Sequence, residues 1–168
     1  ANSLTVQVAL TTNAGAITLS AENDVIFSAA GDLTSTNVNI SVAADDDATS
    51  DAASGGALTM VDGTVFNAGS GTVTVSADEN ITIGQITTTN SSSSAIKLSS
   101  ASGNIVDGDT DGSNDLTASN GTVYVADAEL FGLSGNAIEV NASTTNTSGL
   151  TVVVVTSTAD DSLSGSSE

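Results

Sequence analysis

The chain of 168 residues has a single basic residue, Lys97, and it has no arginine, histidine, cysteine, proline or tryptophan. Enzymes draw most of their general bases, activated nucleophiles and anion-binding groups from the residue types that are missing here. We therefore predict a non-enzymatic, structural protein. Without cysteine no disulfide can form. No run of the sequence approaches the ~18 apolar residues that a membrane span requires, so membrane insertion is not expected.

Twenty acidic residues stand against that one lysine and give a formal net charge of −19. A negative field of this size repels phosphate backbones and anionic lipid headgroups, so nucleic acid is not an expected partner. The partners that remain are cations, neutral glycans of a host or cell surface, and further copies of the chain. Acidic chains that are rich in serine and threonine, poor in lysine and free of cysteine are common among secreted bacterial surface proteins. We expect an extracellular or cell-surface location.

Apolar and polar residues alternate in many short runs, for example at residues 4–8, 38–42 and 96–98. Such alternation predicts strands with one buried and one exposed face. Clusters of glycine, asparagine, aspartate and serine separate the runs and predict turns. Hydrophobic residues make up 39% of the chain, which favours a packed core over disorder. We expect one all-β domain over residues 1–168.

The chain also contains a longer repeat: residues 15–27 align without a gap on residues 71–83. Repeats of ~20–50 residues indicate stacked architectures. We predict a right-handed parallel β-helix, or β-solenoid, in which the runs at 17–19 and 25–27 are successive strands of one coil and the run at 38–42 belongs to the next. About eight coils spaced ~4.8 Å apart would form a rod of ~35–40 Å.

A β-sandwich, as in a pilin-like or surface-layer domain, is the alternative fold. About ten short strands with a turn every 8–12 residues fit a sandwich as well. The irregular spacing of the repeat favours the sandwich, and the gapless match favours the β-helix. In either fold, residues 43–55 and 107–115 are expected as acidic loops, and residues 159–168 as a flexible tail.

Residues 15–27 and 71–83 both begin with a small residue that is followed by alternating apolar and polar residues. A weaker form of this pattern occurs at Gly103-Asn104-Ile105 and Leu116-Thr117-Ala118. In this pattern most of the chain resembles the repeat segments of filamentous-haemagglutinin-like exoproteins and other giant bacterial β-helical adhesins. The resemblance implies a stalk segment of a surface adhesin or a self-assembling filament subunit.

The sharpest local motif begins at Asp107 and follows the spacing of a calcium-binding loop. Ca²⁺ takes 6–8 hard oxygen ligands, and carboxylates stand here at positions 1, 3, 5 and 9 of the loop pattern, with a backbone carbonyl at position 7. The predicted calcium ligands are Asp107, Asp109, Asp111, Ser113 and Asp115. Ala118 stands where the pattern has a bidentate glutamate, so another strand would have to complete the site. The alternative interpretation is a solvated acidic turn.

Both ends of the chain carry apolar runs that predict strands with unpaired edges. Such edges invite self-association into a homopolymer, either by head-to-tail stacking or by strand donation. Residues 1–10 are the candidate donor or capping strand. Donation would suit the β-sandwich alternative, which would then be a donor-strand-exchange pilus or surface-layer subunit.

A β-helical carbohydrate-active enzyme is a minor alternative. Two carboxylates can hydrolyse a glycoside, and Asp127 with Glu129 is the candidate pair, but both are expected on an outer face. Strand parity also places Lys97 outward, whereas Phe27 and Phe66 are expected to lie inside the core.

Overall fold

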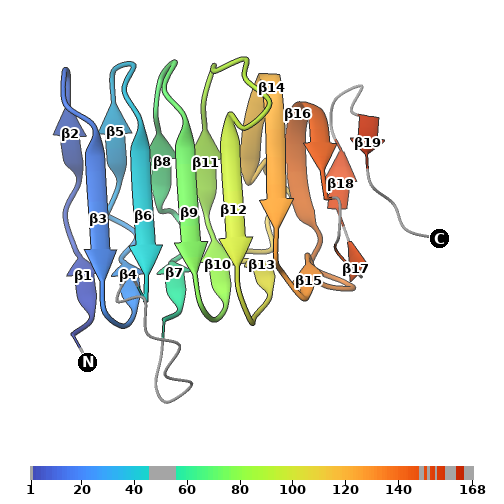
Figure 1. Ribbon diagram of the computed structural model, residues 1–168, viewed down its shortest axis with the longest axis horizontal. Helices are drawn as coiled ribbons and strands as arrows, with labels where there is room; N and C mark the ends of the chain where they lie inside the picture. The colour runs from blue at the N-terminus through green and yellow to red at the C-terminus, as the bar shows by residue number, and fades with distance from the viewer. Residues whose placement is uncertain are drawn as a thin grey trace.

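The computed structural model describes residues 2–45, 56–147, 150, 152–153, 155–157 and 162–164, and these residues form an all-β rod with no helix (Figure 1). The strands are β1 (Leu4–Val6), β2 (Leu10–Thr12), β3 (Ile17–Ala21), β4 (Val25–Phe27), β5 (Leu33–Ser35), β6 (Ile40–Ala44), β7 (Leu58–Met60), β8 (Val65–Asn67), β9 (Val73–Ala77), β10 (Ile81–Ile83), β11 (Gln85–Thr87), β12 (Ile96–Ser100), β13 (Ile105–Asp107), β14 (Leu116–Ala126), β15 (Leu130–Phe131), β16 (Ile138–Asn146), β17 (Val152–Val153), β18 (Val155–Ser157) and β19 (Ser162–Ser164).

Three successive strands make one coil, and equivalent strands of successive coils pair in parallel on three faces. The first face runs β1-β4-β7-β10-β13-β15-β17. The second face begins β2-β5-β8-β11 and the third β3-β6-β9-β12, and both continue into the long strands β14 and β16, which cross from one face to the other. In Figure 1 the chain rises on the far side, descends on the near side and advances from left to right, which is a right-handed winding.

The structure confirms the predicted parallel β-solenoid and excludes the β-sandwich, whose sheets are antiparallel. About eight coils were predicted, whereas the part of the chain that the structure describes forms about six turns. Coils are longer than expected where the sequence carries an insert. Ile17 pairs with Ile40, 23 residues further on, whereas Ile40 pairs with Val73, 33 residues further on.

The core is a set of aliphatic columns that run along the inside of the rod. Strand parity turns every second side chain inward, and the register places Val25, Leu58 and Ile81 in one column, all with no exposed surface. Fully burying a side chain of this size contributes roughly 1.5–3 kcal/mol. Phe27 and Phe66 are buried as predicted and meet edge to face, with ring centroids 4.8 Å apart.

Lys97 lies on the outer side of β12, between the buried residues Ile96 and Leu98, as strand parity predicts. Its register partners are Thr74 in the coil before and Tyr124 in the coil after. The third face therefore carries its one lysine in the middle of a column of polar side chains.

Asparagine and aspartate side chains tie successive coils together at the starts of strands. Asp24 Oδ1, just before β4, accepts the backbone N–H groups of Gly56 and Ala57, both at 3.1 Å, just before β7. Three further side-chain oxygens accept a backbone N–H from the next coil in the same way: Asp32 from Val65, Asn39 from Thr72 and Asn80 from Asn104. Each bond supplies an acceptor to an N–H group at a corner of the coil.

Three sequence predictions concern segments that the structure describes in part. Residues 1–10 do not form one strand, because they are divided between β1 and β2, which pair with β4 and β5. The acidic loop expected at 43–55 follows the end of β6, and its residues 46–55 lie outside the described residues. Most of the expected tail at 159–168 also lies outside them, apart from β19, which pairs with β16.

Candidate metal centre

The acidic motif forms the connection between β13 and β14, at the corner between the first and second faces. Asp107 is the last residue of β13 and is in register with Ile83 of β10. In the first three coils the same column is occupied by Val6, Phe27 and Met60, all of which are buried. A carboxyl group therefore stands in a column of the core that is otherwise apolar.

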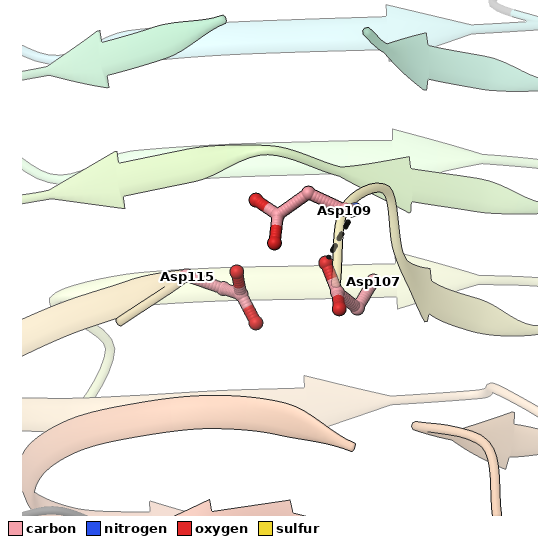
Figure 2. A group of neighbouring side chains, drawn as sticks. All are labelled: Asp107, Asp109 and Asp115. Atoms are coloured by element: carbon pink, nitrogen blue, oxygen red, sulfur yellow. Dashed lines mark hydrogen bonds between the residues drawn. The ribbon is translucent and has the colours of Figure 1, made fainter. Parts of the chain in front are cut away.

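Three of the five predicted ligands come together at this corner. One carboxylate oxygen from each of Asp107, Asp109 and Asp115 lies within 4.8 Å of the others. Figure 2 shows the three carboxyl groups turned toward one another, with Asp115 approaching from the start of β14. Asp107 is only 7% exposed and Asp115 only 2%, whereas Asp109 is half-buried.

The backbone of the loop is shaped by three consecutive turns, each closed by an aspartate side chain. Asp107 Oδ1 accepts the N–H of Asp109 at 2.8 Å, and Asp109 Oδ1 accepts the N–H of Asp111 at 2.9 Å. Asp111 Oδ1 in turn accepts the N–H of Ser113 at 2.6 Å. Aspartate favours such turns because its short side chain reaches the backbone two residues on. The alternating aspartates of the motif thus fold the loop as well as supply its charge.

The next coil holds this loop in place. Asn136, in the turn between β15 and β16, donates its side-chain Nδ2–H to the carbonyl oxygens of Asp109 at 2.9 Å and Asp107 at 3.4 Å. Asp115 Oδ2 accepts the backbone N–H of Glu139 in β16 at 2.9 Å. Neither Asn136 nor Glu139 was found by sequence reasoning, because both belong to a different coil from the motif.

Burial, together with the neighbouring charge of Asp107, raises the pKa of Asp115 to about 8, against the lowering effect of the hydrogen bond from the Glu139 N–H. Burial also raises the pKa of Asp107, and the carboxylates of Asp109, Glu139 and Asp111 act in the same direction. Both shifts have the same main cause, which is that the carboxyl groups are held away from water, and the nearby carboxylates add to it.

Asp111 and Ser113 do not join the cluster. Asp111 is exposed, and the backbone N–H of Ser113 lowers the pKa of its carboxyl group. Both residues line a pocket of about 120 Å³, and Asp109 and Asp115 of the cluster line the same pocket. Asp62 and Gln85, from the two preceding coils, line the same pocket and were not found from the sequence.

The donor set fits a hard divalent cation. Three carboxylates, with backbone carbonyls and water to complete the shell, match the all-oxygen coordination that Ca²⁺ prefers. A cation here would take the place of the protons that the buried carboxyl groups otherwise hold, and it would neutralise the ionised carboxylates. The residues of the site that could hold it are Asp107, Asp109 and Asp115.

No protein-family model, no curated protein and no solved structure matches the chain. The fold and the site geometry therefore carry the functional argument by themselves. Among the described residues there is no helix that could cross a membrane.

The carboxylate pair of the enzyme alternative lies at a different corner. Asp127 and Glu129 follow β14, and both are exposed. Asp127 Oδ2 accepts a hydrogen bond from the Ser99 hydroxyl at 3.5 Å. Neither residue lines the pocket beside the acidic loop.

Proposed function

We propose that the chain is a non-enzymatic structural rod of an extracellular surface protein, either a stalk segment of a bacterial adhesin or a self-assembling filament subunit. The observation that carries this proposal is the parallel ladder that joins successive coils on all three faces. About six turns at the ~4.8 Å spacing of paired strands give a rod about 30 Å long. In these ladders each coil pairs with its neighbouring coils, so the architecture extends by adding coils, as a spacer requires.

The resemblance to filamentous-haemagglutinin-like repeats supports the same function. Residues 15–27 and 71–83 carry that resemblance, and they occupy equivalent places in the rod: β3 leads into β4 as β9 leads into β10. The repeat in the sequence thus corresponds to a repeat in the fold. The extracellular location is supported by composition, since a chain with one exposed lysine offers trypsin-like proteases a single cleavage site.

End-to-end assembly is favoured over strand donation within this proposal. A donor strand has to leave its own subunit, and residues 4–12 already pair with β4 and β5 through two regular ladders. Donation would break those ladders.

Electron microscopy and small-angle X-ray scattering test the rod function together. Scattering should give the profile expected of one solenoid about 30 Å long or of several joined end to end, and negative-stain images in calcium should show filaments if the chain is a filament subunit. Rods without filaments would indicate a stalk segment and would turn the search to glycans that bind its sides. A scattering profile that a solenoid of these dimensions does not fit, or turnover of a polysaccharide by the purified chain, would contradict the proposal.

Calcium binding is a second, separate proposal, supported by the three carboxylates that lie within 4.8 Å of one another. We infer that Ca²⁺ binds Asp107, Asp109 and Asp115 and stiffens the corner between two coils. Calorimetric titration with Ca²⁺ should show one site, and Asp109→Asn should weaken it by at least about tenfold because a charged ligand is lost.

Asp127→Asn is the matched control for the calcium site. It makes the same change of charge at an exposed residue outside the cluster, and asparagine tolerates the left-handed backbone found there (φ 59°). Equal loss of affinity in the two variants would mean that net charge, and not the cluster, attracts the ion.

A further inference from the structure

The third face of the solenoid, formed by β3, β6, β9, β12 and the end of β14, differs in charge from the rest of the described surface. In Figure 1 these strands lie side by side on the near side of the rod. The described acidic residues lie at or next to the two corners that border the first face. We propose that the third face binds a neutral polysaccharide. Such a partner suits an extracellular rod, and the inference rests on that proposed function.

The distribution of charge leaves the third face without a carboxylate. Glu22, Asp78 and Asp127 lie at the corner between the third and first faces, and Asp32 and the acidic loop lie at the corner between the first and second. Among the described residues, the strands of the third face and the turns that enter them from the second face contain no acid and one base, Lys97. A neutral partner can cover this face without removing carboxylates from water, which would be costly.

Small side chains, many of them hydroxyl-bearing, cover most of the third face. Strand register places Thr18, Ser41 and Thr74 in one outward column that continues to Lys97. The hydroxyl groups of these three residues make no hydrogen bond to another described residue, so each can both donate and accept a bond. A second outward column, two residues further along each strand, consists of serine and alanine: Ser20, Ala43, Ser76, Ser99 and Ala126.

Two larger side chains extend above these small ones. Lys97 and Tyr124 are register partners on β12 and β14. Lys97 is exposed and pairs with none of the described acidic residues, although it is the only base in the chain. Tyr124 is half-buried, and its hydroxyl makes no hydrogen bond to a described residue. A tyrosine ring offers an apolar surface to the C–H groups of a sugar, and the two polar ends can bond its hydroxyl groups.

The chemistry of the face favours a neutral glycan over other partners. The negative field of the chain repels anions, and a basic partner would be drawn to the acidic corners. Protein interfaces are enriched in aromatic anchors and methionine and contain little serine, alanine or lysine. The exposed large hydrophobic residues of the described chain all lie away from the third face: Val8, Leu10, Ile26, Val61 and Leu133. The third face is therefore a poor match for a second copy of the chain.

The test is binding of the full chain to an array of immobilised neutral and acidic oligosaccharides, followed by calorimetric titration with the neutral oligosaccharide that gives the strongest signal. Tyr124→Ala removes the ring, and Thr74→Glu places a carboxylate beside Lys97. Each should raise the dissociation constant by at least about tenfold, as expected when a central contact is lost. Binding of the unmodified chain should change little with salt, because the partner carries no charge.

Thr82→Glu is the matched control for Thr74→Glu, because Thr82 is also a half-buried, outward-facing threonine but lies in β10 on the first face. Ile26→Ala controls for Tyr124→Ala, since it removes a large exposed side chain from β4 on the first face. Both controls should bind as the unmodified chain does. Circular dichroism melts establish that each variant is folded.

The proposal is overturned if no neutral oligosaccharide binds, or if Thr74→Glu and Thr82→Glu weaken binding equally. Binding confined to acidic oligosaccharides, with a steep decline in salt, would assign Lys97 to an anionic partner and would also overturn it. So would a sedimenting mass that rises with concentration in the unmodified chain and not in Tyr124→Ala, because the face would then bind a second copy. Scattering tests the rod function without a ligand, so a rod that binds no glycan would leave that function intact.

Discussion

The carboxyl group of Asp115 accepts the backbone N–H of Glu139 at 2.9 Å, across the junction between two successive coils. Asp24, Asp32, Asn39 and Asn80 make the same kind of bond at other coil junctions. Asp115 differs from these residues in being almost fully buried and in lying beside two further carboxylates. The same structural role has thus been combined with a concentration of carboxyl groups, and we expect the stability of this corner to depend on protons and cations.

The first prediction concerns pH. The pKa of Asp115 is raised from 3.8 to about 8 in the folded chain, chiefly by burial. Between these two values the folded chain holds a proton that the unfolded chain has released, so the free energy of unfolding should fall as pH rises from about 4 to about 8. Thermal melts in chelator at a series of pH values should show this decline. Asp115→Asn, which carries no proton to lose, should flatten it, and an unchanged slope in that variant would contradict the assignment.

Calcium should reverse that pH dependence. Ca²⁺ binds the ionised carboxylates, so its stabilising effect should be largest near pH 8 and should fade toward pH 4 as protons compete for the same oxygens. The measurement is the difference in melting temperature with calcium and with chelator at each pH. A difference that is independent of pH would place the ion away from Asp107 and Asp115.

The bonds between coils give a third prediction. Asp24→Ala removes the acceptor for two backbone N–H groups, those of Gly56 and Ala57, and should lower the free energy of unfolding by about 1–3 kcal/mol. Asp24→Asn keeps an oxygen in the same place and should lose much less. Urea unfolding of the two variants measures the free energy of unfolding that each loses. Equal losses would mean that the charge of Asp24, and not its hydrogen bonds, stabilises the chain.

Two glycines at equivalent places in the repeat should respond differently to the same substitution. A Cβ at Gly71 would overlap the backbone of Val38 in the preceding coil, whereas at Gly15 the nearest atom is Thr12 Oγ1 at 3.8 Å. Gly71→Ala should therefore destabilise the chain by about 1–3 kcal/mol through overpacking. Gly15→Ala should be neutral or slightly stabilising, because the first coil has no described coil before it. Equal effects on the urea midpoint would contradict this account of the close approach.

The contrast between Gly15 and Gly71 also shows what the sequence can reveal. The two residues align in the repeat, and the repeat with its alternation was enough to predict the solenoid, since each coil is built from local signals. The number of coils was not accessible, because the inserts before Gly56 and before Leu116 change the coil length. The aspartates of the acidic loop could be picked out because they are close together in sequence, whereas Asn136 and Asp62 were missed because they reach the loop from other coils.

Asp107 offers the most direct test of whether the carboxyl groups at this corner serve to bind an ion or to stabilise the fold. Its column is occupied by Phe27, Met60 and Ile83 in the preceding coils, so Asp107→Ile continues the pattern of the core. Removing an ionisable group from an apolar column and burying a methyl-bearing side chain should raise the free energy of unfolding in chelator by about 1–3 kcal/mol. The same substitution should abolish the additional stabilisation by Ca²⁺. A variant that is more stable in chelator, and that calcium no longer stabilises, would mean that Asp107 binds the ion at a cost to the stability of the core. If Asp107→Ile is instead destabilising in chelator, the hydrogen bond from the Asp109 N–H is what holds the loop, and the role of Asp107 is structural.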